Sequence, residues 1–115
     1  MADCIFCKIA RKEIPAEIVF EDDRAVAFKD LHPIAPLHVL VVPREHIPTT
    51  NDVNDGNCAL AGHLLDVAAQ VAKKAGYAES GYRLILNTNR DAGQEVFHVH
   101  LHVLGGKRLG PMLSR

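Results

Sequence analysis

The chain has 115 residues, of which 48% are hydrophobic and 23% are charged. A chain of this length and composition is expected to form one globular domain with an apolar core, so disorder is excluded. The formal net charge is −1, and no block of Lys and Arg residues could follow a phosphate backbone. Nucleic-acid binding is therefore not expected.

The N-terminal sequence MADCIFCKIARKEIP has neither a basic start followed by a long apolar run nor a small-residue cleavage site, so we expect no signal peptide. No run of about 18 apolar residues occurs anywhere, so we expect no membrane span. These features predict a cytoplasmic protein. In that compartment Cys4, Cys7 and Cys58 should be reduced thiols or metal ligands rather than disulfides.

The first half of the chain predicts a short helix followed by strands. Residues 4–9 are apolar on one side and carry a Cys-x-x-Cys motif, which suits one or two helical turns ending near Pro15. Residues 18–20 and 25–29 flank a polar cluster and read as a hairpin. A turn with two prolines then leads into a strand over residues 38–42, which Pro43 ends.

The second half predicts one long helix and two more strands. Apolar residues recur every three or four positions over residues 57–75, and Gly76 gives a C-terminal stop. Strands are expected over residues 82–87 and 98–104, on either side of a polar, Gly-containing loop. The whole chain, residues 1–115, is thus expected to be a single α+β domain with an antiparallel sheet, because a parallel β-α-β fold would need more helices.

The segment HVHLHVL at residues 98–104 alternates strictly, so a strand here places His98, His100 and His102 on one face. Alternate residues of a strand lie about 6.5–7 Å apart, and three imidazoles then form a row about 13 Å long, comparable to a short polyphosphate ester. A single strand histidine would be a buried residue with satisfied nitrogens, but three in register indicate function. The pattern itself leaves a metal site as an alternative, because His-x-His on a strand also presents metal ligands.

This segment resembles the alternating histidine signature of the histidine triad (HIT) family. The segments AFKDLHPIAPLHVLVVPREHI, GYRLILNTNRDAGQEVFHVHLHVLGG and RLGPML resemble its bacterial adenosine phosphoramidase branch in order and spacing, over nearly the whole chain. The resemblance implies a HIT-like fold of about five antiparallel strands, one long helix and a short N-terminal helix. It also implies a hydrolase that acts on the α-phosphate of purine nucleotides.

The resemblance implies a catalytic set of four histidines. His100 would attack the α-phosphorus to give a nucleotidyl-histidine, which water resolves; neutral imidazole is abundant near pH 7, a good nucleophile and a good leaving group. His102 would hand a proton to the leaving group. His98 would be structural, and His38 would lie near the phosphates, although without the resemblance it could be a solvated strand end.

The nucleotide contacts are also implied by the resemblance. Asp30 would accept hydrogen bonds from the ribose, although the residue alone could equally be a turn residue. Leu31 and Phe28 would hold the base by apolar packing, which favours purines without selecting sharply among them. The phosphates would meet the strand end and the Gly-containing loop, at Asn87, Gly93, Gln94, Glu95 and Val96. A carboxylate at position 95 repels phosphate, so its contact would be through the backbone or with the leaving group.

No cofactor is expected to be required for catalysis, but the resemblance also implies a structural zinc ion held by Cys4, Cys7, His46 and His98. The residues alone permit a plain pair of buried thiols and a solvated His46. Their spacing is wider than that of a Cys₂His₂ finger.

The expected activity is cleavage of the P–N bond of adenosine 5′-phosphoramidates. The alternatives are hydrolysis of dinucleoside polyphosphates and a non-catalytic nucleotide-binding or scaffold module. A homodimer is expected, because the sheet leaves an edge to cover and Ala61, Ala68, Ala69 and Ala72 offer a second helix face. The tail, residues 109–113, would reach toward the partner's site.

Overall fold

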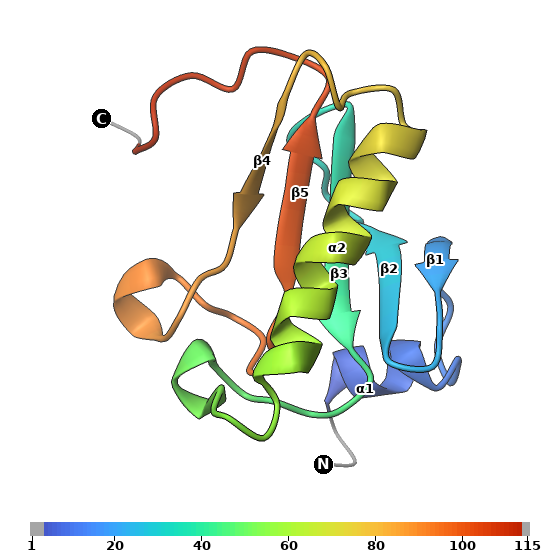
Figure 1. The fold of residues 1–115 in the computed structure, drawn as a ribbon, viewed down its shortest axis with the longest axis vertical. Helices are drawn as coiled ribbons and strands as arrows, with labels where there is room; N and C mark the ends of the chain where they lie inside the picture. Colours follow the sequence, from blue (N-terminus) through green and yellow to red (C-terminus); the bar gives the residue numbers. More distant parts are fainter. Residues whose placement is uncertain (1–3, 114–115) are drawn as a thin grey trace.

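The computed structural model describes residues 4–113 (Figure 1). Its centre is a five-stranded sheet in which every neighbouring pair is antiparallel. This architecture confirms the expected α+β fold. The strands lie in the order β1 (Ile18–Glu21), β2 (Ala25–Lys29), β3 (Leu37–Pro43), β5 (Leu101–Gly105) and β4 (Tyr82–Ile85).

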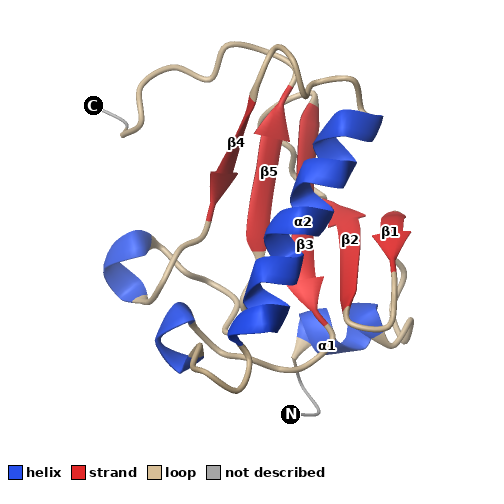
Figure 2. Ribbon diagram, viewed as in Figure 1, coloured by secondary structure: helices blue, strands red, loops and turns tan. Residues whose placement is uncertain are grey.

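Two helices cover opposite faces of the sheet (Figure 2). The long helix α2 (Cys58–Lys74) packs on one face, and the short helix α1 (Ile5–Ala10) packs on the other. Alternation along β2 explains the two layers, because Ala25 and Ala27 join the core under α2 while Val26 and Phe28 join the core under α1. Two 3₁₀ turns, η1 (Thr50–Asp52) and η2 (Arg90–Ala92), lie in the loops.

Helix α2 ends just before Gly76, the glycine that was predicted to stop it. Gly76 has a φ of 93°, a left-handed conformation that residues with a side chain rarely adopt. Its N–H bonds to the Lys73 carbonyl, and the N–H of Tyr77 bonds to the Ala72 carbonyl, both at 3.0 Å. This pair of hydrogen bonds is a Schellman motif, which satisfies carbonyls at the end of the helix.

The prediction that four alanines form a second face of α2 for packing against a partner is wrong for two of them. Ala68 and Ala72 are fully buried against the sheet, where their small side chains let the helix approach closely. Ala61 is half-buried and only Ala69 is exposed. The helix therefore presents no alanine surface to a partner.

Both late strands are shorter than expected. The strand expected to begin at His98 begins at Leu101, and the one expected to run to Asn87 ends at Ile85. β3 and β5 pair in a register that places Val41 opposite Leu101, and continuing it would place Pro43 opposite Val99. Proline has no N–H to donate to the ladder, so the regular pairing stops before Val99. The N–H of Val99 instead bonds to the Ile47 carbonyl at 2.7 Å.

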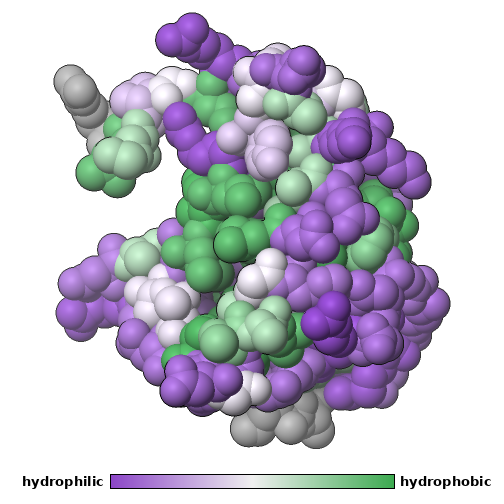
Figure 3. All heavy atoms as spheres, viewed as in Figure 1, coloured by the Kyte–Doolittle hydropathy of each residue, from purple (hydrophilic) through white to green (hydrophobic). Residues whose placement is uncertain are grey.

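The outer edge of the sheet at β4 carries apolar surface. The face shown in Figure 3 is hollowed between the C-terminal segment and the η2 segment, and apolar atoms line the hollow. Leu86 after β4 and Leu65 on α2 are large, exposed apolar residues. The C-terminal segment is tied to β4 by Arg83, which donates to the carbonyls of Gly110 and Pro111 at 2.8 and 3.4 Å.

Within residues 4–113, no helix is long and apolar enough to cross a membrane.

The β1–β2 turn is fastened to α2 by Asp22. Its Oδ2 lies 2.6 Å from His63 Nε2, and its Oδ1 accepts from the backbone N–H groups of Arg24 and Ala25, each at 2.8 Å. Burial raises the pKa of the Asp22 carboxyl, but these hydrogen bonds outweigh that effect and hold it below its usual value. The carboxylate form therefore stabilises the fold.

We predict that Asp22→Asn lowers the free energy of unfolding by about 1 kcal/mol at pH 7, because a charged acceptor of three hydrogen bonds is lost. A lowered native pKa gives stability that is present above the usual Asp pKa and is lost as the pH falls through the native value. Urea unfolding at pH 7 and pH 3 would measure this. Asp23→Asn, at an exposed neighbour, is the control; equal effects of both variants would contradict the prediction.

Candidate active site

The triad histidines lie in a row on the face of the sheet that α1 covers. His102 belongs to β5 and pairs with Leu40 of β3, whose side chain is in the core under α1. The rings of His100 and His102 are 5.1 Å apart between centroids. The intervening Val99, Leu101 and Val103 are buried on the α2 side, so the predicted alternation is confirmed even though only His102 lies within the regular strand. Burial decreases along the row: His98 is fully buried, His100 nearly so, and His102 half-buried.

One hydrogen bond defines the chemistry of His100. Its Nδ1 lies 2.8 Å from the backbone carbonyl oxygen of His98. A carbonyl oxygen can only accept, so Nδ1 carries the proton and Nε2 of the neutral ring holds an unshared electron pair. The ring also packs edge-on against Phe6, with 5.0 Å between centroids. The imidazole is therefore fixed in the tautomer that a nucleophile requires.

A second chain of hydrogen bonds orients His102. The backbone N–H of Ile34 donates to His38 Nδ1 at 3.2 Å, which leaves the ring proton of neutral His38 on Nε2. That Nε2 lies 3.0 Å from His102 Nδ1 and 3.5 Å from a carboxylate oxygen of Asp30. With Nδ1 accepting from His38, neutral His102 holds its own proton on Nε2, the position from which it can be passed on.

Burial makes both of these histidines weak bases. Burial, together with nearby His100 and His38, lowers the pKa of His102 to about 4. It also lowers the pKa of His38, an effect that the Asp30 carboxylate partly offsets. An anionic phosphate placed beside His102 would raise its pKa again, because the negative charge favours the imidazolium.

A cleft of about 490 Å³ opens beside the row of histidines. It collects almost all residues that the sequence predicted to contact a nucleotide, from four separate parts of the chain. These residues are Phe28, Asp30, Leu31, Asn87, Gly93, Glu95, Val96, His100 and His102. Leu31 and Glu95 are exposed, and no ion pair of Glu95 occurs among the described residues.

The sequence reasoning missed one wall of the cleft. Ile5, Phe6 and Ile9 of α1 line it, together with Pro15 and Ala16. The spacing of Ile5 and Ile9 on one face of a helix was the available signal, but their nearness to the histidines depends on the tertiary fold.

Gln94 is not brought into the cleft. Its side-chain amide donates to the carbonyls of Pro48 and Val96 at 2.9 and 3.0 Å, and its carbonyl oxygen accepts from the N–H of Asn89 at 2.8 Å. The side chain is nearly buried, so its role here is to brace the loop. Gly93, beside it, has the positive φ of 80° that the turn needs.

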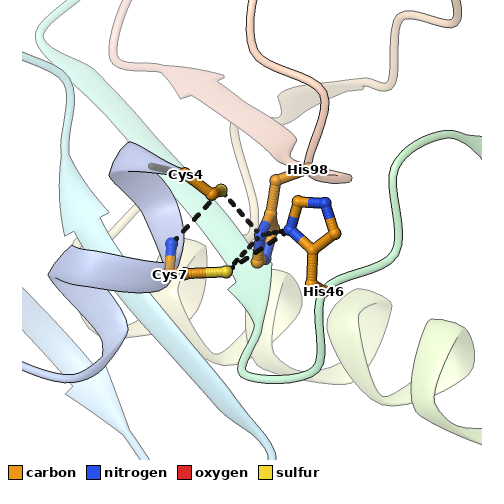
Figure 4. Close-up of side chains that lie close together, drawn as sticks. All are labelled: Cys4, Cys7, His46 and His98. Carbon is orange, nitrogen blue, oxygen red and sulfur yellow. Dashed lines mark hydrogen bonds between the residues drawn. The ribbon is translucent and has the colours of Figure 1, made fainter. Parts of the chain in front are cut away.

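Four residues predicted as metal ligands come together behind the row (Figure 4). Cys4 Sγ and Cys7 Sγ lie 3.3 and 3.5 Å from His98 Nδ1, and Cys7 Sγ lies 3.3 Å from His46 Nδ1. The two imidazole Nδ1 atoms are 3.1 Å apart. Burial lowers the pKa of His98 to about 4, although its hydrogen bond to Pro43 opposes this. Burial and the neighbouring Cys4 raise the pKa of the Cys7 thiol.

The donor set fits a tetrahedral zinc ion. With Zn–S near 2.3 Å and Zn–N near 2.1 Å, a tetrahedron places S and N about 3.6 Å apart and two N atoms about 3.4 Å apart, close to the separations found. His98 Nε2 lies 2.8 Å from the Pro43 carbonyl oxygen, so Nε2 carries the proton and Nδ1 offers its electron pair to the cluster. A ligating histidine commonly has such a backbone acceptor on its other nitrogen.

Comparisons with known proteins show to which family the chain belongs. The profile of the HIT domain family matches residues 11–109. A purine nucleoside phosphoramidase of Escherichia coli K12 is 53% identical over 112 residues, which cover 97% of this chain and 94% of that protein. An uncharacterized HIT-like protein of Synechocystis is 49% identical over 105 residues, which cover 91% of each.

Solved structures share the fold. A HIT family hydrolase from Legionella pneumophila superposes with a TM-score of 0.92 at 50% identity, covering 94% of this chain and 96% of that one. A HIT family hydrolase from Clostridium thermocellum gives 0.95 at 45% identity, covering 99% of each. The chain belongs to the HIT family.

We predict that the His102 imidazole in the nucleotide-free protein stays neutral until the pH approaches 4. Because the unfolded chain takes up this proton near the ordinary histidine pKa of about 6.5, the folded protein loses stability as the pH falls from about 6.5 toward 4. Titration of the ring nitrogens by ¹H–¹⁵N NMR would measure the midpoint. A midpoint above pH 6 would contradict the environment described for His102.

Proposed function

We propose that this chain is a purine nucleoside phosphoramidase that cleaves the P–N bond of adenosine 5′-phosphoramidates. The observation that carries the proposal is the hydrogen bond from His100 Nδ1 to the His98 carbonyl, which leaves Nε2 unprotonated in a ring that lines the cleft. The relative at 53% identity is a purine nucleoside phosphoramidase, which supports the same substrate class here.

The first step forms a covalent intermediate. His100 Nε2 bonds to the α-phosphorus, and the P–N bond to the amine breaks with its electron pair going to the amine nitrogen. That nitrogen takes a proton from His102 Nε2, because an amine is expelled far more easily than an amide anion. The substrate phosphate stabilises the imidazolium form of His102 that donates this proton. In that form Nδ1 of His102 also carries a proton, so His38 must accept it at Nε2 and carry its own ring proton on Nδ1, in place of the hydrogen bond from Ile34.

The second step releases the nucleotide. Water attacks the phosphorus and gives a proton to His102 Nε2, while the bond to His100 breaks and its electron pair returns to Nε2. The nucleoside monophosphate leaves and both histidines regain their starting protonation. His38 touches His102 but lies deeper in the fold, so it orients the proton donor.

The remaining cleft residues suit a purine nucleotide. Ile5, Phe6, Phe28 and the exposed Leu31 offer apolar surface for the base. Asp30 Oδ1 accepts the N–H of His32 at 2.8 Å in a local turn. Its Oδ2 lies 3.5 Å from His38 Nε2 and can still accept from a ribose hydroxyl. The phosphate end would then meet Asn87, the backbone around Gly93, and the two histidines.

We predict that His100→Ala lowers phosphoramidate turnover at least about 1000-fold while the affinity for AMP changes by about threefold or less, because the nucleophile acts mainly in the transition state. Initial rates with adenosine 5′-phosphoramidate and calorimetric titration with AMP would measure the two effects. Diadenosine tetraphosphate is the comparison substrate. Retention of a tenth of wild-type turnover would exclude His100 as the nucleophile.

The same geometry supports a structural zinc ion bound by Cys4, Cys7, His46 and His98. Zinc would join α1, the loop after β3 and the start of the histidine row, and it would stabilise His98 in its present orientation. No step of the reaction passes through this site.

We predict that protein purified without chelators carries close to one zinc per chain, and that Cys7→Ser removes the metal and lowers Tm by about 5 °C or more. Elemental analysis and thermal unfolding would test this. Cys58→Ser, at the exposed cysteine, is the matched control and should change neither quantity. Metal-free protein whose Tm is unaffected by added zinc would contradict the zinc site and show that Cys4 and Cys7 are a plain pair of thiols.

We also propose a homodimer formed through the apolar edge at β4. Among the residues that the structure describes, no strand pairs with the outer edge of β4, and exposed apolar side chains lie beside it (Figure 3). The C-terminal segment, held by Arg83, extends from the same edge and would reach the partner's cleft. Its Met112 and Leu113 are exposed in the single chain.

Light scattering at micromolar concentration should therefore give about twice the 12.6 kDa mass of one chain. Leu86→Glu, which places a charge on that apolar edge, should shift the mass toward the monomer because burying an unpaired carboxylate is costly. Leu31→Glu, at an exposed residue of the nucleotide cleft, is the control. A wild-type protein of single-chain mass would refute the dimer.

A further inference from the structure

Helix α1 faces two sites at once. Cys4 is its N-cap and Cys7 lies in its first turn, and both thiols point into the Cys/His cluster (Figure 4). The cleft is lined by other residues of the same short helix, namely Ile5 and Phe6 between the two cysteines and Ile9 after them. Metal ligands and cleft wall thus belong to one rigid turn, so neither can move without the other.

This helix depends on anchors outside itself. It has six residues, too few for a helix that is stable alone in water. Phe6, Ile9 and Ala10 pack on the sheet, while Ile5 is 46% exposed. The N-terminal turn is therefore held by the buried Phe6 ring and by the contacts of Cys4 and Cys7 with the two histidines.

A second connection runs through His98. Its Nδ1 faces the cluster while its backbone carbonyl accepts the hydrogen bond of His100. The Phe6 ring packs edge-on against both imidazoles, with centroids 6.0 Å from His98 and 5.0 Å from His100. An ion that fixes His98 and α1 would therefore also fix the nucleophile and the cleft wall beside it.

We propose that metal binding at Cys4, Cys7, His46 and His98 tightens nucleotide binding in the cleft, which makes this chain a metal-responsive nucleotide-binding protein. The inference rests on the proposed zinc site and nucleotide function. The metal pre-orders α1, so the nucleotide no longer bears the cost of ordering its own binding wall. Thermodynamic linkage requires the reverse effect, in which bound nucleotide raises the affinity for zinc by the same factor.

The test is a two-ligand cycle. The Kd of AMP is measured by calorimetry on zinc-loaded and on metal-free reduced protein, and the Kd of zinc is measured by competition with a chelating indicator, with and without saturating AMP. We expect AMP to bind about fivefold or more tightly to the zinc form, and zinc to gain the same factor from AMP.

Variants separate the coupling from general destabilisation. His46→Ala removes a metal ligand that lies outside α1, so it should give the AMP affinity of metal-free wild type whether or not zinc is added. Asp22→Asn, which loosens the hairpin contact with α2, should keep the full zinc effect on AMP. Loss of the zinc effect in Asp22→Asn would show that it reflects overall stability, and would overturn the coupling.

The outcomes are distinct. Zinc that binds but leaves the AMP affinity unchanged overturns the coupling and leaves the zinc site standing. Failure to bind zinc overturns the zinc site and the coupling together. Failure of both forms to bind AMP overturns the proposed nucleotide function. An AMP affinity about fivefold or more higher in the zinc form, matched by the same factor for zinc, supports the coupling.

Discussion

The contact on which the site depends is the hydrogen bond of 2.8 Å from His100 Nδ1 to the carbonyl oxygen of His98. It joins two residues of one extended segment, so its geometry is set by the backbone rather than by a flexible side chain. The carbonyl cannot change its role from acceptor to donor, which keeps one tautomer of His100. Under the proposed function, this hydrogen bond prepares the nucleophile without a carboxylate partner.

β3 gives the site its second support. The strand is buried along its whole length between β2 and β5, and its alternating side chains serve both layers. Val39 and Val41 pack under α2, while Leu40 and Val42 pack under α1. His38 follows the second set and so faces His102. The orientation of the His102 ring is thus a result of core packing several residues away.

The sequence predicted the fold and the histidine row because both depend on local patterns: a helix period ended by Gly76, and strict alternation from His98 to His102. The ends of the strands were predicted less well. β5 begins at Leu101 rather than at His98 because its pairing with β3 stops next to Pro43, a residue of another strand. The α1 wall of the cleft was missed because only tertiary packing brings it to the histidines. Gln94 was expected in the cleft, but its amide finds backbone partners in the folded loop that a sequence does not reveal.

The alternation between the two faces also limits how the length of this segment can change. Inserting one residue between Leu101 and His102 would reverse the facing of every side chain on one side of the insertion, since side chains of a strand have a period of two. On that side of the insertion the imidazoles would enter the apolar layer beneath α2, and the apolar side chains that alternate with them would face the cleft. The loop around η1 has no such constraint, so natural variation in chain length should gather there and avoid residues 98–104.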